Sequence, residues 1–523
     1  MKNIRHFLLA IASGVLLSCS WYPYGFFGLI FLAFVPLFII SDELISNKTR
    51  FSTLKIFGYG YLTFLIWNGL TVWWISLAAI IGGVLAITVN ALLMATVLAC
   101  WHFAKTKLLK PVFSLFFLIF ISFWAAFEFL HLDWDLNWPW LNLGNVFAAV
   151  PNLVQWYEYT GAFGGTIWVL VVNALLYWLY LQIRRRNKTL IRRTIAGIIA
   201  IITIPVVISI VILKTCQYSG ESVEIVIVQP NTDPWVEQDE RSNQDHIHKI
   251  LTMTRPVLDS KTALLLCPES SISHTFLEED DRLYSNEFKG ERYSFTDSLR
   301  DLIHEFPQLS IGFGASTACI VNQKSAASRP YGEGQYIDHF NTAGCYNARY
   351  GFQFYHKSRL VPAVEKMPFT KILAPLENLA IDLGGVVGTL TRGEEQIPFY
   401  IENGIKVGLP ICYESIYGEV FAAFVKQGAV LMGVITNDSW WQTSPGYRQH
   451  FEMSRLRAIE TRRYIARAAN TGTSAIIDPK GKPHYKTVYG EPAVIKAQVE
   501  LLNRQTFYVR YGDYLARLLT AIA

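Results

Sequence analysis

The chain has few charged residues for its length, and its cysteines form no recognisable pattern. Only 17% of its 523 residues are Asp, Glu, Lys or Arg, whereas soluble globular chains usually carry about a quarter. The seven cysteines are odd in number, and no CxxC or Cys/His spacing indicates a zinc site. These shortages argue against a purely soluble protein and exclude a disulfide-stapled module. We expect no metal and no cofactor.

Basic residues are also not arranged as a nucleic-acid-binding surface would require. The net charge is only +5, and no Lys/Arg stripe interleaved with aromatic residues is visible, so we expect no nucleic-acid partner. Apolar runs of about bilayer-spanning length fill the first two hundred residues instead. We read seven membrane spans, near residues 7–20, 26–41, 57–74, 77–103, 111–130, 163–182 and 194–213.

The loops between these spans alternate in charge. Lys and Arg follow the second, fourth and sixth spans, with six of them between residues 184 and 193, and none follows the first, third or fifth. This is the positive-inside pattern of a multi-pass protein of the cytoplasmic (inner) membrane, with its N-terminus in the cytoplasm. We therefore predict a polytopic α-helical membrane domain over residues 1–215. Seven crossings would place the following residues on the periplasmic side.

From about Glu221 the sequence alternates between short β-branched runs and polar, helix-like segments, which predicts a layered α/β domain. The expected strands are Val223–Gln229, Ala263–Cys267, Leu309–Gly314, Ile405–Cys412, Val430–Thr436 and Ser474–Ile477. The expected amphipathic helices cover residues 237–259, 292–305, 416–427 and 449–469.

Three reactive side chains stand where apolar runs of this domain end: Glu269, Lys357 and Cys412. Each could instead be without a catalytic role, because a Cys at a strand end is usually a core residue and a Glu or Lys there is usually solvated. Together they form a complete set for acyl transfer through a thioester. Glu269 would take the thiol proton of Cys412, and Lys357 would stabilise the thiolate and the oxyanion.

The motifs around these residues resemble those of the nitrilase (carbon–nitrogen hydrolase) superfamily over residues 221–499. Pro268-Glu269 resembles its glutamate motif, the residues from Tyr355 to Pro362 its lysine motif, and those from Pro410 to Glu414 its nucleophile motif. The resemblance implies an αββα sandwich with a Glu-Lys-Cys triad.

The same resemblance implies supporting residues around the triad. Glu365 would be a second acidic group, but Ala363-Val364 replaces the usual Phe-Gly before it and leaves its placement open. The remaining candidates are two residues beside the nucleophile and three in aromatic or Asn-containing loops: Tyr413, Glu414, Trp235, Asn437 and Trp440.

With its preceding spans, the whole chain resembles the bacterial apolipoprotein N-acyltransferase family. This implies a phospholipid as acyl donor and the diacylglyceryl-cysteine at an apolipoprotein's N-terminus as acceptor. A membrane-tethered amidase with water as acceptor is the alternative, and a transporter or scaffold is a rival from another class. Residues 362–400 would be a mobile lipid-facing arm or a plain surface excursion. Residues 500–523 would form a C-terminal stub that docks against the membrane, because only the ten residues Tyr514–Ala523 remain of the family's last span and these are too few to cross.

Some residues have more than one interpretation. We expect Cys267 and Cys319 to be core residues and leave Cys345 open. Arg455, Arg457 and Arg463 belong either to a charged helix face or to a substrate site.

Overall fold

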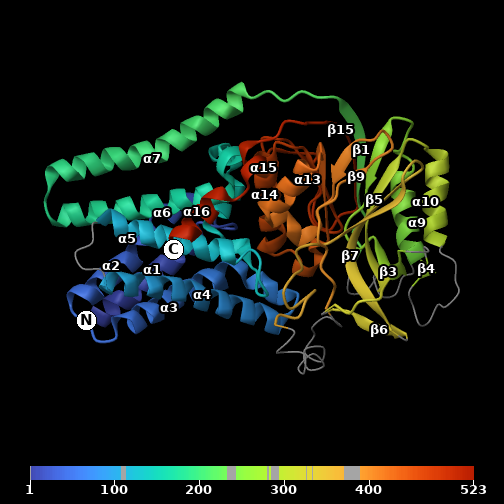
Figure 1. The fold of residues 1–523 in the computed structure, drawn as a ribbon. Coiled ribbons are helices and arrows are strands. Elements are labelled where there is room, and N and C mark those ends of the chain that lie inside the picture. Colours follow the sequence, from blue (N-terminus) through green and yellow to red (C-terminus); the bar gives the residue numbers. More distant parts are fainter. Residues whose placement is uncertain are drawn as a thin grey trace. The chain divides into compact units, whose positions relative to one another are not determined.

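The chain divides into two compact units, which are described separately. A computed structural model describes residues 2–107, 113–232, 243–278, 282–283, 294–325, 327–332, 334–369 and 389–523. One unit is helical and comprises Met1–Cys216 with Tyr511–Ala523, and the other comprises Gln217–Arg510 (Figure 1). The change of sequence texture near residue 221 therefore lies close to the boundary between two units.

The helical unit places one helix at each predicted span. In the described residues these are α1 (Lys2–Cys19), α2 (Val35–Ser46), α3 (Ser52–Val72), α4 (Ile80–Lys107), α5 (Phe113–Leu130), α6 (Tyr157–Arg184) and α7 (Lys188–Thr215). Four segments of the described chain are long and apolar enough to cross a membrane, namely Phe27–Ser46, α4, α6 and α7, and α1 and α5 contain shorter apolar helices. The chain is a membrane protein with several apolar helices, and the count of seven crossings stays a prediction.

Aromatic side chains fill the interior of the helical unit. Phe34, Trp101 and Trp124 are fully buried, and the Phe34 ring meets that of Trp124 edge to face at 4.9 Å. The Asn173 side chain accepts from the Phe34 N–H and donates to the Ile30 carbonyl, both at 2.9 Å. These bonds satisfy backbone groups between η1 (Phe27–Phe31) and α2, which a bilayer would leave unpaired.

Glu128 is a buried carboxylate in the last turn of α5. It accepts hydrogen bonds from the Trp124 indole (2.9 Å), the Leu143 backbone N–H (2.8 Å) and the Thr166 hydroxyl (2.7 Å). These donors lie on α5, on η4 (Leu143–Ala149) and on α6. The carboxylate therefore ties elements of the unit together, and it gives the transporter interpretation no support.

The C-terminal helix α16 (Tyr514–Ile522) packs against α5 and α6 of the helical unit (Figure 1). Its Ala516 is fully buried, and the Arg517 guanidinium lies 5.8 Å from the centre of the Phe129 ring. Nine residues of helix span only about 14 Å, so α16 is too short to cross a bilayer. Docking of residues 500–523 against the membrane itself stays a prediction.

The α/β unit contains two mixed sheets. In the described residues the larger has nine strands, with the order β15-β1-β2-β5-β3-β4 and with β7 joining β5 to β6 and β8; the smaller has the order β14-β13-β12-β11-β10-β9. The strands of the larger sheet are β1 (Ser222–Gln229), β2 (Thr262–Leu266), β3 (Ile272–Leu277), β4 (Arg282–Leu283), β5 (Ser310–Val321), β6 (Arg329–Gly332), β7 (Gln335–Asn347), β8 (Gly351–His356) and β15 (Ala493–Glu500). Those of the smaller are β9 (Phe399–Tyr400), β10 (Lys406–Gly408), β11 (Leu431–Thr436), β12 (Ile465–Ala469), β13 (Ala475–Ile477) and β14 (Pro483–His484).

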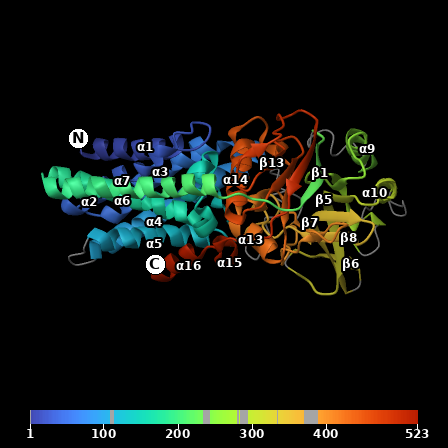
Figure 2. The same cartoon turned by 90° about the horizontal axis from the view of Figure 1, so that it is seen from above.

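Helices cover the outer face of each sheet, so the unit has the predicted αββα layers (Figures 1 and 2). The helices α9 (Asn243–Thr254) and α10 (Ser294–Glu305) lie on the larger sheet, and α13 (Gly418–Lys426) and α14 (Pro445–Thr461) lie on the smaller. The central strands β2 and β11 are buried at every position, as strands covered on both faces are. The predicted fold class is confirmed.

For two elements the predicted C-terminal boundary is wrong. The helix expected over residues 449–469 stops at Thr461, where Arg462 adopts a left-handed conformation (φ +50°), and residues 465–469 form β12 instead. The strand expected over Ile405–Cys412 is regular only over Lys406–Gly408, and beyond it a single isolated bridge joins Ile411 to Ile435 of β11. Cys412 starts a short 3₁₀ helix, η7 (Cys412–Ile416), because the chain turns away from the sheet there.

Candidate active site

The candidate catalytic residues lie on loops that follow strands of both sheets. Glu269 follows β2, Lys357 follows β8, and Cys412 follows β10. In α/β sheets, loops at strand ends are the usual place for a site. Gly314 of β5 allows the Glu269 loop to lie close to the sheet, because a side-chain carbon at that position would be 2.5 Å from the Glu269 Cα.

Lys357 is buried between two carboxylates. Its Nζ donates to Glu365 Oε1 at 2.7 Å and lies 3.5 Å from Glu269 Oε1, and only 1% of its side chain is exposed. Burial disfavours the charged amine, but the negative charges of Glu365 and Glu269 more than offset this and raise the pKa of Lys357. The structure therefore holds a permanent cation beside two of the predicted site residues.

Asn341 of β7 is a member of this group that the sequence did not reveal. Its Nδ2 donates to Glu269 Oε1 at 2.9 Å and to Glu365 Oε1 at 2.8 Å, and its backbone carbonyl accepts from the Lys357 N–H at 2.9 Å. One amide thus bridges the two carboxylates that flank the lysine. No motif signals it, because it lies in the middle of a strand that the sequence analysis did not predict.

Glu365 reaches the site although the usual glycine before it is missing. Val364 stands in place of the glycine, and Ala363 before it has the left-handed conformation (φ +61°). The Val361 carbonyl accepts the Glu365 N–H at 2.9 Å to close the turn. The Val361 N–H in turn donates to Glu365 Oε2 at 2.8 Å. The substitution therefore leaves Glu365 in contact with Lys357.

Cys412 is a half-buried residue in a conformation that non-glycine residues seldom adopt (φ +46°). Burial, and next the negative charge of Glu269, raise the pKa of the Cys412 thiol, while Lys357 acts in the opposite direction. The resting side chain is thus a thiol rather than a thiolate, and it needs a base to become a nucleophile. Glu269 and Lys357 thus both influence the pKa of this thiol, and the catalytic triad itself stays a prediction.

Glu414 joins the lysine loop to the nucleophile loop. Its fully buried carboxylate accepts from the Ser358 N–H and hydroxyl at 2.7 and 2.6 Å, from the Tyr355 hydroxyl at 2.6 Å, and from the Ile411 N–H at 2.8 Å. Tyr413 is also buried, and its ring packs on Tyr417. Glu414 therefore fixes the site's framework rather than facing the triad.

Asn437 connects Glu269 to the smaller sheet. Its backbone N–H donates to Glu269 Oε2 at 2.9 Å, and its side-chain oxygen accepts from Asn470 Nδ2 at 3.2 Å. Its Nδ2 is buried and has no hydrogen-bond acceptor among the described residues. Trp440 is half-buried in η8 (Asp438–Trp441), and Trp235 lies outside the described residues.

A buried charged network lies beneath the nucleophile. The Asp438 carboxylate accepts from His450 Nδ1 and from Arg467 Nη2, both at 2.8 Å. His450 Nε2 lies 2.7 Å from the Ser415 hydroxyl oxygen and 3.1 Å from the Cys412 carbonyl oxygen. Burial raises the pKa of Asp438, but Arg467 and His450 outweigh it and bring the value to about 2. Asp438 is therefore ionised. Through His450, which contacts Ser415 and the Cys412 carbonyl, the network fixes the first turn after Cys412.

The three arginines singled out in the sequence, Arg455, Arg457 and Arg463, all donate to backbone carbonyls. Arg457 donates to the Ile416 carbonyl, Arg463 to the Ala429 carbonyl at 3.0 Å, and Arg455 to the Gly481 carbonyl at 2.7 Å. Arg457 and Arg463 are buried, so their role in the structure is to bind backbone carbonyls. The charged-face interpretation is wrong for these two.

The other cysteines of the α/β unit differ in their surroundings. Cys267 belongs to the core between the larger sheet and its helices, as predicted, and burial raises the pKa of Cys267 and of Cys345 to about 12. Cys319 is only half-buried, so its assignment to the core is wrong.

Two family profiles match successive parts of the chain. One, described as the apolipoprotein N-acyltransferase N-terminal domain, matches residues 13–175. The other, described as carbon-nitrogen hydrolase, matches residues 227–506. The second match covers more than half of the chain and includes every candidate catalytic residue.

Several relatives match this chain over nearly its whole length. An apolipoprotein N-acyltransferase of Chlorobaculum tepidum is 26% identical to this chain, over 99% of the chain and 95% of the relative. One of Geobacter metallireducens is 25% identical, over 98% and 92%. One of Aquifex aeolicus is 25% identical, over 95% and 99%. The chain therefore belongs to the carbon–nitrogen hydrolase family and, with the N-terminal domain joined to it, to the apolipoprotein N-acyltransferases.

Proposed function

We propose that the protein moves an acyl chain from a phospholipid to the α-amine of a diacylglyceryl-cysteine at the N-terminus of an apolipoprotein. In the first half-reaction the Cys412 sulfur attacks an ester carbonyl of the phospholipid while Glu269 takes the thiol proton. Lys357 stabilises the oxyanion of the tetrahedral intermediate. Glu269 then returns the proton to the leaving alkoxide, so a lysophospholipid departs and a thioester remains on Cys412.

In the second half-reaction Glu269 and Lys357 have the same roles, and the acyl group leaves Cys412. The free amine of the acceptor attacks the thioester carbonyl, Glu269 takes a proton from the attacking nitrogen, and Lys357 again stabilises the oxyanion. Collapse of the intermediate breaks the carbon–sulfur bond, and Glu269 returns the proton to the Cys412 thiolate. The product is an amide and the resting thiol, which is a ping-pong reaction through a covalent intermediate.

The observation that carries this proposal is the buried cation held between Glu269 and Glu365. A lysine fixed by a 2.7 Å contact to Glu365 and lying 3.5 Å from Glu269 is already oriented before substrate binds. Because burial and Glu269 keep the pKa of Cys412 high, a base must act in the same step as the attack. Glu269 is the carboxylate whose charge acts most strongly on the thiol, which supports its assignment as that base.

Asn437 supports the oxyanion role from the side of the smaller sheet. Its side-chain oxygen is engaged by Asn470, and its Nδ2 faces no acceptor in the described part of the chain. A buried donor without a partner costs about 1–3 kcal/mol, which a substrate oxygen would remove. We assign this donor to the substrate, with Tyr413, Trp440 and Trp235 as further pocket residues.

The location of the reaction follows from the loop charges. We propose that the α/β unit stands on the periplasmic side of the bacterial inner membrane, with seven helices anchoring it. Both substrates are acylated and insoluble in water, so a membrane-anchored enzyme meets them where they reside. The segment 362–400 remains our candidate for a lipid-facing arm, and its residues 370–388 lie outside the described part of the chain.

A transfer assay tests the proposal. The purified chain is incubated with phospholipid vesicles and a diacylglyceryl-cysteinyl peptide, and the products are identified by mass spectrometry. We expect an N-acylated peptide and a lysophospholipid in equal amounts. Free fatty acid alone, with unmodified peptide, would identify water as the acceptor and a membrane-tethered amidase instead.

A further inference from the structure

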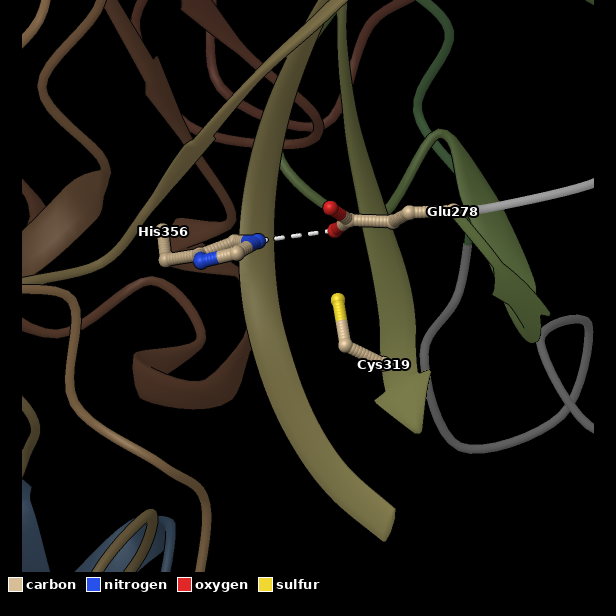
Figure 3. A group of neighbouring side chains, drawn as sticks. All are labelled: Glu278, Cys319 and His356. Carbon is tan, nitrogen blue, oxygen red and sulfur yellow. Dashed lines mark hydrogen bonds and ion pairs between the residues drawn. The ribbon is translucent and has the colours of Figure 1, made fainter. Parts of the chain in front are cut away.

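A second group of reactive side chains lies on the larger sheet, away from the triad. Glu278, Cys319 and His356 each present one ligand-type atom, and these atoms lie within 4.8 Å of one another. His356 Nε2 is 2.7 Å from Glu278 Oε1. In Figure 3 the Cys319 thiol and the Glu278 carboxylate lie on the same side of the His356 ring. Three different donor types therefore converge on one point.

The strand register places this group on the sheet face opposite Lys357. Phe352 and Phe354, which alternate with His356 along β8, pack on the core that contains Phe313 of β5. Cys319 shares a face with Phe313, because residues of even spacing along a strand point to the same side. Lys357 comes one residue after His356 and bonds to Glu269 and Glu365 instead. The group is thus separate from the candidate active site.

Its geometry distinguishes it from a second catalytic triad. In a Cys-His-Glu triad the thiol and the carboxylate occupy opposite nitrogens of the imidazole, so that the ring can pass on a proton. Here the thiol and the carboxylate share the Nε2 side (Figure 3). A thiol and a carboxylate that both lie on the Nε2 side of an imidazole are arranged as the ligands of one metal ion are.

The framework around the group is fixed by the sheet. The Glu278 N–H donates to the Ala318 carbonyl at 3.2 Å, and Cys319 pairs with Asp338 of β7. The His356 ring is stacked on Phe340, with centroids 3.8 Å apart. Side chains held on neighbouring strands need little ordering to bind an ion.

We propose that Glu278, Cys319 and His356 bind a zinc ion. Thiolate, imidazole and carboxylate together suit zinc, and three protein ligands leave a fourth tetrahedral position for water. Tetrahedral ligands at zinc distances are about 3.5 Å apart, so binding requires the Glu278–His356 pair, which is 2.7 Å apart, to open slightly. The Cys319 thiol gives up its proton on binding.

This site is one that spacing along the sequence does not reveal. Its ligands are contributed by β5, by the end of β8 and by the residue after β3, far apart in the chain. The expectation of no metal rested on the lack of a local Cys/His motif, which says nothing about ligands from separate strands. The proposal does not depend on the acyl-transfer reaction, because the site lies on the other face of the sheet.

Metal titration of the full-length chain tests the site. The protein is purified in detergent, freed of metal with a chelator, and titrated with Zn²⁺, and bound metal is counted by elemental analysis. We expect about one equivalent per chain. Cobalt(II) serves as a spectroscopic probe, because a cobalt–thiolate bond gives a charge-transfer band in the near ultraviolet.

Matched variants identify the ligands. Cys319→Ser should abolish the cobalt–thiolate band and weaken zinc binding about tenfold or more, and Glu278→Gln should weaken zinc binding but keep the band. Cys100→Ser, which changes an exposed cysteine of α4, should bind as the unchanged chain does. Near-ultraviolet circular dichroism checks that each variant is folded. The absence of a stoichiometric metal, or unaltered binding by folded Cys319→Ser, would overturn the proposal.

Discussion

Asn341 is a residue whose contribution can be separated from that of the triad. Its amide donates to both Glu269 and Glu365, and hydrogen bonds to charged groups are worth about 1.5–3 kcal/mol. We expect Asn341→Ala to lower kcat about 10- to 100-fold, because the two carboxylates would no longer be held around Lys357. Steady-state transfer assays measure this effect. A variant with unchanged kcat would show that the bridge has no role in the reaction.

The Asp438 carboxylate makes the stability of the α/β unit depend on pH, with a loss of stability in acid. Its pKa falls from 3.8 to about 2 on folding, so the folded state is favoured while the group is ionised. This contribution, about 2 kcal/mol, is present above pH 4 and is lost as the pH falls toward 2. We expect Asp438→Asn to be less stable than the unchanged chain at pH 6, with the difference shrinking in acid. Thermal melts at several pH values in detergent test this, and a pH-independent difference would contradict it.

The sequence predicts reactive residues better than it predicts those that support them. Glu269, Lys357 and Cys412 each end an apolar run, which is visible without a structure. Asn341 and His450 give no such signal, since their partners are brought to them only by the fold. The placement of Glu365 was left open because a glycine was missing, and the turn forms with Ala363, the residue before the glycine's position, in the left-handed conformation.

At the scale of elements, Glu414 joins the loops after β8 and before η7. It accepts from donors on Tyr355, Ser358 and Ile411. Replacing one carboxylate oxygen by an NH₂ group would leave buried donors facing a donor, at a cost of about 2–4 kcal/mol. We expect Glu414→Gln to lower the melting temperature by several degrees. The exposed Glu395→Gln is the control, and equal melting temperatures for the two variants would contradict this role.

Element boundaries are predicted less well than element types. The run from 449 to 469 has the composition of one helix, but it is divided by Arg462, which takes a left-handed conformation without the Gly or Pro that would signal a break. The strand β7 is not visible as such because polar residues, Asn341 and Thr342 among them, lie within it. In both cases tertiary contacts override the local pattern.

At the scale of the whole molecule, the low charge content of the chain is an average over two unlike parts. The helical part carries Lys and Arg in alternate loops, and the α/β part has the composition of a soluble enzyme. This division is predictable from sequence because apolar runs of bilayer length are a strong signal. The crossing number is harder to fix, since only four described segments meet the length and composition of a membrane span.

The proposed orientation predicts which surfaces reagents reach. We expect a cysteine introduced at Glu395 in the α/β unit to react with a membrane-impermeant maleimide in intact spheroplasts. One introduced at Arg185, in the basic loop between α6 and α7, should react only after permeabilisation. Labelling is measured against the chain without the added cysteine, and the opposite pattern would reverse the assigned topology.

The central claim is that Cys412 carries the acyl chain, and intact-protein mass spectrometry tests it most directly. After incubation with phospholipid in the absence of acceptor, we expect the mass to rise by one fatty acyl group that hydroxylamine removes. Cys412→Ala and Cys412→Ser should both lack this adduct and the transfer activity. An adduct on another residue, or full turnover by Cys412→Ser, would contradict the account.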